Sequence, residues 1–149
     1  MVESLSVPTF RVGYPVTSDA LDALYERGVT MTAILAKAAA MALVQHPVVN
    51  ASCKDGKNFA YNSNINIAIA VAINGGLITP VLRDADKGAI MAVGASKPTV
   101  LAEKDGFFSV KNKMLVNVTA DHRIIYGTDL AALLQTFSKI VANPESLKL

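Results

Sequence analysis

One stretch of the sequence, residues 117–134 (NVTADHRIIYGTDLAALL), changes its hydrophobic period within a few residues. An apolar run rich in β-forming residues ends at Asp121-His122-Arg123, and beyond Gly127 the apolar residues recur at helical spacing. Asn143-Pro144 then ends the helical pattern, because proline cannot continue a helix. The stretch therefore predicts a strand that leads into a helix over about residues 128–141. The apolar stripe of this helix consists of Leu130, Leu133, Leu134, Phe137 and Ile140.

Two further helices are predicted in the first third of the chain. Residues 30–46 are rich in Ala, Leu and Met, their apolar residues fall at helical spacing, and Pro47 closes the pattern. Residues 18–27 indicate a shorter helix, for which Ser18 or Asp19 can act as the N-cap. The small residues of the longer helix suggest that it packs closely against a core or a neighbouring subunit.

Predicted strands account for much of the remaining chain. Residues 7–17 are typical of a strand that Pro8 and Pro15 confine to a sheet edge or to strand ends. Over residues 65–73 large apolar side chains alternate with asparagine and alanine, which indicates a strand buried on both sides. Further strands are expected after Gly76 and over residues 89–95 and 114–120, with turns at Asp55-Gly56 and Asp105-Gly106. Helices and a mixed sheet, joined by hairpin turns instead of regular βαβ alternation, favour an α/β two-layer sandwich.

The composition narrows the classes of function. A chain of 149 residues suits one domain, residues 1–149, with a sizeable core. The net charge is +2 without a basic block, which argues against a nucleic-acid partner. No apolar run approaches the roughly 20 residues of a membrane span, and the N-terminal residues lack the features of a signal peptide. One cysteine and two histidines are too few ligands for a structural zinc site, so no metal site is expected.

His122 is the main candidate for chemistry. A histidine with an ordinary pKa near 6.5 is mostly neutral at pH 7, so its ring can accept a proton from a hydroxyl or a thiol. A loop directly after a strand holds such a ring while leaving its edge accessible, and Asp121 and Arg123 can pair to fix that loop. The alternative is a loop histidine that only satisfies backbone groups. The residue types alone leave both interpretations open.

Motifs along nearly the whole chain carry a resemblance to a known family. "DHRIIYG" followed by "TDLAALLQTF" resembles the C-terminal signature of the dihydrolipoamide acyltransferases, the core subunits of 2-oxoacid dehydrogenase complexes. Segments that agree in the same order are "SLSVPTF", "HPVVNAS", "INIAIAV", "GLITPV" and "NPESL". The plastid-type pyruvate dehydrogenase acetyltransferases are the nearest subgroup, because most of the family has Asp or Asn where this chain has Tyr126.

The resemblance implies a fold and an assembly. It implies a chloramphenicol-acetyltransferase-like fold and homotrimers that assemble into a larger cage. The implied partners are the pyruvate dehydrogenase and dihydrolipoamide dehydrogenase components and a lipoyl domain outside this chain, which carries the lipoate. The implied location is the chloroplast stroma.

The resemblance also implies an activity, which is the transfer of an acetyl group between a dihydrolipoyl thiol and coenzyme A. The histidine of D-H-R is the family's general base, so this role carries over to His122. A free thiol is only a few per cent thiolate at pH 7, so a positioned base increases the reactive population. Tyr126 is a second candidate site residue, because its position in the family helps to orient the histidine. A phenol can donate a hydrogen bond there but supplies no carboxylate charge at neutral pH.

The chain departs from the family at two junctions, between residues 27 and 28 and between residues 87 and 88. In the family, a segment resembling "GTFTLSNLG" lies at the second junction and provides the Ser or Thr that donates to the oxyanion. Either these residues were omitted from the chain or the deletion is genuine. The direct passage from the charged turn at Lys87 into an apolar strand favours omission.

The remaining polar candidates have simpler interpretations. Cys53 is expected to be a small packed or turn residue, and His46 is expected to cap or pack a helix end. Arg11 and Lys37 can contact the phosphates of coenzyme A, but both side chains are expected to be solvated. Residues 74–81 are expected to form a turn and a strand, near the substrate channel that the resemblance implies. No coenzyme A contact is therefore assigned. Two alternatives to the acetyltransferase stay open, namely a catalytically silent scaffold of such a complex and an acyltransferase with a small hydroxyl or amine acceptor.

Overall fold

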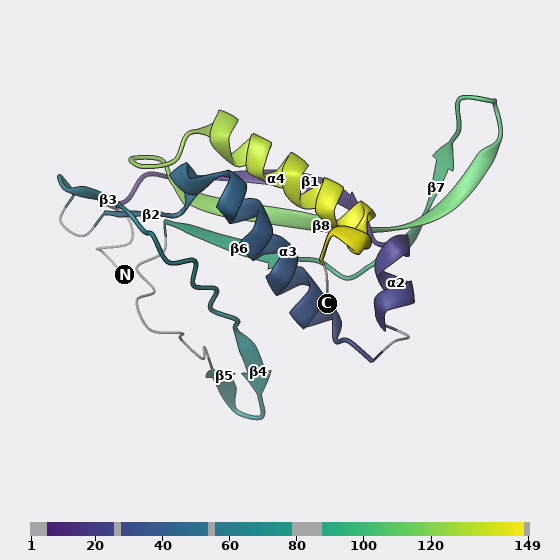
Figure 1. Cartoon of the computed structure of the whole chain (residues 1–149), viewed down its shortest axis with the longest axis horizontal. Helices are drawn as coiled ribbons and strands as arrows, with labels where there is room; N and C mark the ends of the chain where they lie inside the picture. Colours follow the sequence, from purple (N-terminus) through teal and green to yellow (C-terminus); the bar gives the residue numbers. More distant parts are fainter. Residues whose placement is uncertain (1–5, 26–27, 54–55, 79–87, 148–149) are drawn as a thin grey trace.

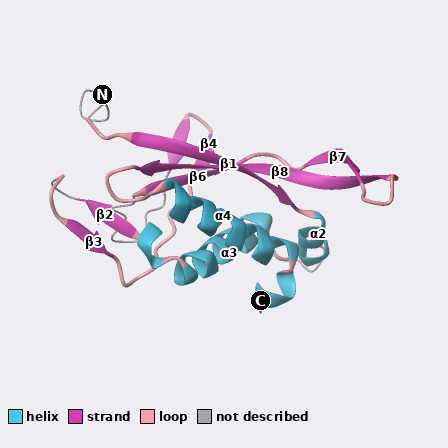
Figure 2. Cartoon of the chain, turned by 90° about the horizontal axis from the view of Figure 1, so that it is seen from above, coloured by secondary structure: helices cyan, strands magenta, loops and turns pink. Residues whose placement is uncertain are grey.

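The computed structural model describes residues 6–25, 28–53, 56–78 and 88–147. Its centre is a four-stranded antiparallel sheet with two long helices packed on one face (Figures 1 and 2). The strands of this sheet are β1 (Thr9–Thr17), β6 (Ala89–Val93), β7 (Lys97–Ala102) and β8 (Phe108–Asp121). The two helices are α3 (Met31–Gln45) and α4 (Gly127–Ala142). The predicted two-layer α/β fold is confirmed.

The long strand β8 organises the sheet. β1 pairs along one edge of β8, from Thr9 opposite Asp121 to Thr17 opposite Lys113. β6 and β7 share the other edge, β6 beside the C-terminal half of β8 and β7 beside its N-terminal half. Alternate residues of β8 face the helices and are buried, namely Met114, Val116, Val118 and Ala120. β1 forms its only ladder among the described residues with β8, which fits the edge position predicted from Pro8 and Pro15.

The predicted helices are confirmed in the described residues, which leave out residues 26–27 at the end of the shortest one. The side-chain hydroxyl of Thr30 accepts a hydrogen bond from the backbone N–H of Ala33 and caps the start of α3. His46 ends α3, and Pro47 begins the 3-10 turn η1 (Pro47–Val49). The shorter helix α2 runs over Asp19–Tyr25. A second 3-10 turn, η2 (Pro144–Leu147), follows α4.

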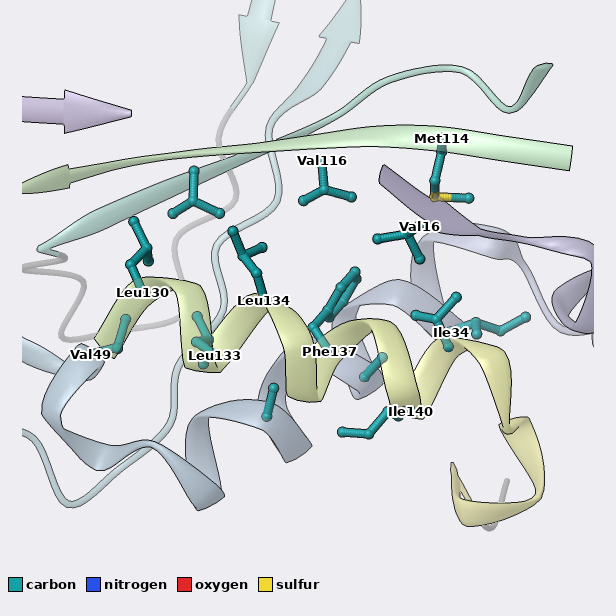
Figure 3. Packing of buried hydrophobic residues seen from close by; sticks show 14 of the residues in the cluster. Val16, Ile34, Val49, Met114, Val116, Leu130, Leu133, Leu134, Phe137 and Ile140 are labelled. Carbon is teal, nitrogen blue, oxygen red and sulfur yellow. The ribbon is translucent and has the colours of Figure 1, made fainter. Parts of the chain in front are cut away.

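The core lies between α4, α3 and the sheet. Figure 3 shows Leu134 and Phe137 of α4 directed toward Val116 of β8 and Val16 of β1. Phe137 is the largest of the fully buried side chains. The whole predicted stripe of α4 is buried, which is the period-3.6 pattern of a helix that covers a sheet.

The strand predicted over residues 65–73 is largely wrong. Only Val71–Ile73 forms a strand, β4, which makes a hairpin with β5 (Gly76–Ile78) around Gly75 at a φ of 89°. Residues 65–70 belong to no strand and form an irregular segment between β3 and β4 (Figure 1). An alternating pattern forms a strand only when a neighbouring strand pairs with its backbone, and the described residues provide no such neighbour here.

Three strands were not predicted. β2 (Ala51–Cys53) and β3 (Phe59–Tyr61) form a separate two-stranded sheet, which the side-chain amide of Asn50 supports by donating to the carbonyl of Asn62. β7 extends β8 toward its N-terminus, so β8 begins at Phe108 instead of near residue 114. The sequence signal for these strands is weak because they are short or rich in polar residues.

The distal part of the main sheet projects beyond the helices. We call residues 97–113 the β7–β8 arm, whose turn lies at Asp105-Gly106 as predicted (Figures 1 and 2). Its exposed apolar side chains include Phe107 at 73% and Phe108 at 76% of their full accessible area. Two such rings on a narrow ribbon form an exposed apolar surface. Within the described ranges, no helix has the length and apolar character needed to cross a membrane.

Candidate active site

The Asp121-His122-Arg123 motif forms a tight turn between β8 and α4. The carbonyl of Asp121 accepts hydrogen bonds from the backbone N–H groups of Ile124 and Ile125, at 3.2 and 3.0 Å. The side chain of Ile125 is fully buried and anchors the turn in the core. Tyr126 then adopts an extended conformation as the N-cap residue of α4. The turn is therefore held from both sides by regular structure.

Asp121 and Arg123 pair with each other across this turn. The Arg123 Nη2 donates to Asp121 Oδ2 at 2.6 Å, its Nε donates to both carboxylate oxygens, and its backbone N–H donates to Oδ1 at 2.9 Å. The hydrogen bonds from Arg123 lower the pKa of Asp121 despite its partial burial. The same pairing raises the pKa of Arg123. The pair therefore fixes the backbone on both sides of His122.

Acidification is expected to weaken the folded state through Asp121. Its pKa lies below the ordinary value near 3.8, so the carboxylate stabilises the fold above that value and loses this contribution as the pH falls through the lowered pKa. The Asp121→Asn variant should be less stable than the unchanged protein at about pH 6, and should lose less stability on further acidification to about pH 3. Urea unfolding at a series of pH values measures this. Parallel pH dependence of the two proteins would contradict the assignment.

The ring of His122 lies exposed against two aromatic rings. Its centroid is 4.7 Å from that of Phe10, at an interplanar angle of 53°, and 6.1 Å from that of Tyr126, at 85°. Its backbone N–H donates to the carbonyl of Pro8 at 2.8 Å. No side chain among the described residues hydrogen-bonds the ring, and His122 is exposed. The structure thus brings the two predicted site residues, His122 and Tyr126, into an edge contact.

Phe10 is a residue of this site that the sequence did not single out. It lies 112 residues before His122 and reaches the ring because β1 pairs with β8 in a register that places Phe10 opposite Ala120. Only the strand register reveals this contact, since nothing local to Phe10 distinguishes it from other strand residues.

Gly88 is the first residue after the junction at which the chain departs from the family, and it is hydrogen-bonded to the histidine turn. Its carbonyl accepts a hydrogen bond from the backbone N–H of Asp121 at 2.8 Å, so this junction lies one residue from His122. A Cβ atom at Gly88 would lie 2.8 Å from the backbone oxygen of Ala51 and 3.3 Å from the Cδ1 of Ile125. Close approach of the backbone therefore requires glycine here.

Replacement of Gly88 by alanine is expected to destabilise the fold. The backbone oxygen of Ala51 cannot move aside as a flexible side chain can, so the expected loss is about 1–3 kcal/mol, the usual cost of overpacking. Gly76→Ala is the matched control, because a Cβ at Gly76 would meet no atom within 4 Å. Thermal unfolding of the two variants compares them. Equal melting temperatures would show that the Gly88 contact has no energetic weight.

The other polar candidates are accounted for by structure. His46 caps α3, and its Nε2 lies 2.7 Å from the hydroxyl of Thr136 on α4, which confirms the capping and packing interpretation. Cys53 is a half-buried free cysteine near Arg123. Arg11 donates to the hydroxyl of Thr119 on the exposed face of the sheet. Within the described part of the chain, no three His, Cys, Asp or Glu side chains are grouped as a metal site would need.

The structure also has a separate apolar cavity. Its volume is about 850 Å³, and it lies between α3, β6 and the irregular segment 66–70. Alanine, leucine, isoleucine, methionine and valine dominate its lining. His122 and Tyr126 do not line it, whereas Gly88, whose carbonyl accepts from Asp121, does.

Comparison with known proteins identifies the family of this chain. The profile described as 2-oxoacid dehydrogenases acyltransferase (catalytic domain) matches residues 1–88 and 86–149. Two Arabidopsis thaliana proteins, the dihydrolipoyllysine-residue acetyltransferase components 4 and 5 of the chloroplastic pyruvate dehydrogenase complex, are 61% and 50% identical to the chain. These alignments cover 100% and 99% of the chain but only 43% and 44% of the relatives. The chain thus spans less than half of their length.

Solved structures show the same fold at lower sequence identity. The cubic core of a pyruvate dehydrogenase multienzyme complex has a TM-score of 0.85 at 18% identity, over 99% of this chain and 87% of the other. A second solved structure is a dihydrolipoamide acetyltransferase from Azotobacter vinelandii, determined to investigate the catalytic roles of a serine, a histidine and an asparagine. Its TM-score is also 0.85, at 17% identity, over 99% of this chain and 87% of the other. A chloramphenicol acetyltransferase has 0.66 at 11% identity, with coverage of 91% and 89%.

The solved structures show that the chain has the fold of the chloramphenicol acetyltransferases. The chain belongs to the 2-oxoacid dehydrogenase acyltransferase (catalytic domain) family. The family and fold predicted from the sequence motifs are therefore confirmed.

Proposed function

We propose that the chain is the catalytic core of a dihydrolipoyllysine-residue acetyltransferase of a pyruvate dehydrogenase complex. The observation that carries this proposal is the 61% identity with the Arabidopsis component 4 over the whole chain. The exposed ring of His122, held by a fixed turn with its nitrogens free of described side-chain partners, is the feature that this chemistry needs.

His122 acts as the general base in this proposal. Its neutral ring accepts the proton of the coenzyme A thiol as the sulfur attacks the carbonyl carbon of the S-acetyl-dihydrolipoyl group. The C–S bond to the dihydrolipoyl sulfur then breaks, and that sulfur takes the proton back from the ring. The products are acetyl-coenzyme A and the dihydrolipoyl thiol, and the same steps run in reverse. Coenzyme A is thus a substrate, and the lipoyl lysine belongs to another domain.

Tyr126 is proposed as a positioning residue. Its ring meets the ring of His122 edge-on at 6.1 Å, which restricts the imidazole through packing. Asp or Asn at the corresponding family position would act by a hydrogen bond instead. The role proposed for Tyr126 therefore depends on its ring and not on its hydroxyl.

The tetrahedral oxyanion also needs a hydrogen-bond donor. The resemblance places that donor in a segment for which this chain has no counterpart at residues 87 and 88. The alignment with the Arabidopsis component 4 extends over 206 residues, whereas this chain has 149, so 57 aligned positions of the relative face no residue of this chain. This difference supports a second candidate function, a catalytically silent scaffold of the same complex.

The proposed assembly is a homotrimer that joins a larger cage and binds the pyruvate dehydrogenase and dihydrolipoamide dehydrogenase components. The exposed rings of the β7–β8 arm support it, because an apolar ribbon beyond the helices suits burial against a second copy. The proposed location is the chloroplast stroma, which rests on the chloroplastic relatives.

Substitution in the arm is expected to dissociate the oligomer. Phe108→Ser removes a large exposed ring, and loss of an interface anchor worth about 2 kcal/mol raises the dissociation constant about 30-fold. Tyr61→Ser is the control, because Tyr61 is equally exposed on β3 at the other end of the molecule (Figure 1). Sedimentation velocity over a concentration series measures both variants. Unchanged association of the Phe108 variant would place the interface elsewhere.

The experiment that tests the function is acetyl transfer from acetyl-coenzyme A to dihydrolipoamide by the assembled protein. Transfer that saturates with both substrates supports the acetyltransferase. No transfer by an intact oligomer supports the scaffold.

A further inference from the structure

The imidazole ring of His122 requires contacts that hold it in one orientation. An exposed side chain can rotate among several staggered χ1 positions and over a broad range of χ2. A general base must present its nitrogen at a defined place, because a displacement of about 1 Å can cost about 100-fold in rate. Within the described chain no side chain hydrogen-bonds this ring, and its aromatic contacts are with Phe10 and Tyr126. Packing against these two rings is therefore the restraint that the structure offers.

The ring of Phe10 is the nearer and the less exposed of the two. Its centroid lies 4.7 Å from that of His122, compared with 6.1 Å for Tyr126. Phe10 is half-buried and packs against the hydrophobic core, whereas Tyr126 is 60% exposed. Side chains packed in a core are held in one rotamer by their neighbours. Phe10 is thus the firmer support for the imidazole.

Phe10 is itself held by the elements on both sides of the histidine turn. The pairing of β1 with β8 places Phe10 opposite Ala120, two residues before His122. A Cβ atom at Gly127 would lie 3.8 Å from the Cε2 of Phe10, so this ring lies beside the first residue of α4. The Phe10 ring therefore packs between the imidazole and the start of the helix.

The backbone of His122 is held by the same end of β1. Its N–H donates to the carbonyl of Pro8 at 2.8 Å, and Pro8 precedes Phe10 by two residues. One residue of this segment supports the backbone of His122, and another supports its ring. Replacement of the Phe10 side chain leaves the backbone hydrogen bond possible, so the two supports can be separated by experiment.

We infer that Phe10 is a positioning residue for acetyl transfer, whose ring holds the imidazole of His122 in one orientation. The inference rests on the proposed function, because it takes His122 as the general base. Phe10 has no side-chain donor or acceptor, so it acts only through the placement of His122. Its loss should therefore lower the turnover rate and leave the binding of both substrates nearly unchanged.

The kinetic test compares Phe10→Leu with Phe10→Tyr. Leucine keeps an apolar side chain against the core but removes the flat ring, so kcat should fall about 10–100-fold. KM for acetyl-coenzyme A and for dihydrolipoamide should stay within about twofold. Tyrosine keeps the ring, so Phe10→Tyr should retain kcat within about threefold of the unchanged protein.

Tyr14→Leu is the matched control. Tyr14 is a half-buried aromatic residue that faces the core from the same side of β1, four residues beyond Phe10 and opposite Val116. The substitution therefore removes an aromatic ring from the same strand face away from His122, and kcat should stay within about twofold. Circular dichroism and sedimentation velocity verify the fold and the oligomer of each variant. If Phe10→Leu does not fold, Phe10→Met replaces it.

A second measurement follows the imidazole itself and does not require acetyl transfer. The chain has two histidines, His46 and His122, so ¹³C-histidine labelling gives two ring signals, which His122→Asn assigns. The ring current of Phe10 acts on the nearby His122 ring. Phe10→Leu should therefore shift the His122 signal, whereas Phe10→Tyr and Tyr14→Leu should leave it near its original position. The His46 signal should stay in place in all three variants.

Three outcomes would overturn the inference. They are a kcat of Phe10→Leu within about twofold of the unchanged protein, an equal loss of kcat in Tyr14→Leu, and a His122 signal that Phe10→Leu leaves in place. An unchanged protein that transfers no acetyl groups would contradict the proposed function instead. The histidine signals would still decide whether Phe10 holds the ring, so the two failures are distinguishable.

Discussion

The His122→Asn variant is expected to transfer acetyl groups about 10²–10⁴-fold more slowly than the unchanged protein, which is the usual contribution of a general base. Asparagine keeps a similar polar volume, but its amide cannot accept the thiol proton at neutral pH. Because His122 is exposed and contributes only ring contacts and a backbone hydrogen bond, the fold and the oligomer should persist. Initial rates with acetyl-coenzyme A and dihydrolipoamide, measured on oligomers of verified size, give the comparison.

Tyr126 provides the matched control for this prediction. Tyr126→Phe keeps the edge contact with His122 and removes only the hydroxyl, so most of the activity should remain. Tyr126→Ala removes the ring and should lower kcat more than it raises KM, as expected of a residue that positions the base. Equal rates for His122→Asn and the unchanged protein would refute the general-base role. A large loss in Tyr126→Phe would instead assign the role of Tyr126 to its hydroxyl.

The helices were predictable because their signals are local. The apolar stripe of α4 and its stop at Asn143-Pro144 lie within one stretch of sequence, and the structure buries that whole stripe. Thr30 and Pro47 likewise bracket α3. A helix satisfies its backbone hydrogen bonds within itself, so its sequence is sufficient to predict it.

A strand requires a partner, and this accounts for the two main errors. Residues 65–70 have a strand pattern, but their expected neighbour is absent from the described residues, so the segment stays irregular. β7 has a weaker pattern, with Lys97 and Pro98 at its start, yet it forms a strand because β8 extends beside it. Pairing between distant segments decided both cases, and no local window contains that information.

The candidate site was partly predictable for the same reason. The motif places His122 and Tyr126 four residues apart at a strand-to-helix turn, which fixes their proximity. The contacts of Phe10 and Gly88 depend on how β1 and β6 pair with β8. The family resemblance supplied the role of His122, whereas the geometry supplied its surroundings.

Truncation of Phe137 is expected to cause the largest loss of stability. Phe137 is 0% exposed and lies between α4 and the sheet, so Phe137→Ala should cost about 3–5 kcal/mol through lost burial and the cavity left behind. A loss of that size is a large part of the 5–15 kcal/mol typical of a whole domain. At about 2–4 °C per kcal/mol for a chain of this length, the melting temperature should fall by about 10 °C.

The same truncation at an exposed phenylalanine is the control that separates the effect of burial from the effect of the residue type. Phe59 is 52% exposed on β3, so Phe59→Ala deletes the same atoms but removes little surface that folding had buried. Urea unfolding of both variants should show that the free energy of unfolding falls by less than about 1 kcal/mol for Phe59→Ala, compared with about 3–5 kcal/mol for Phe137→Ala. Comparable losses would mean that β3 packs in solution against a surface that the single chain lacks. A small loss for Phe137→Ala alone would mean that α4 repacks on the sheet and fills the space that the ring leaves.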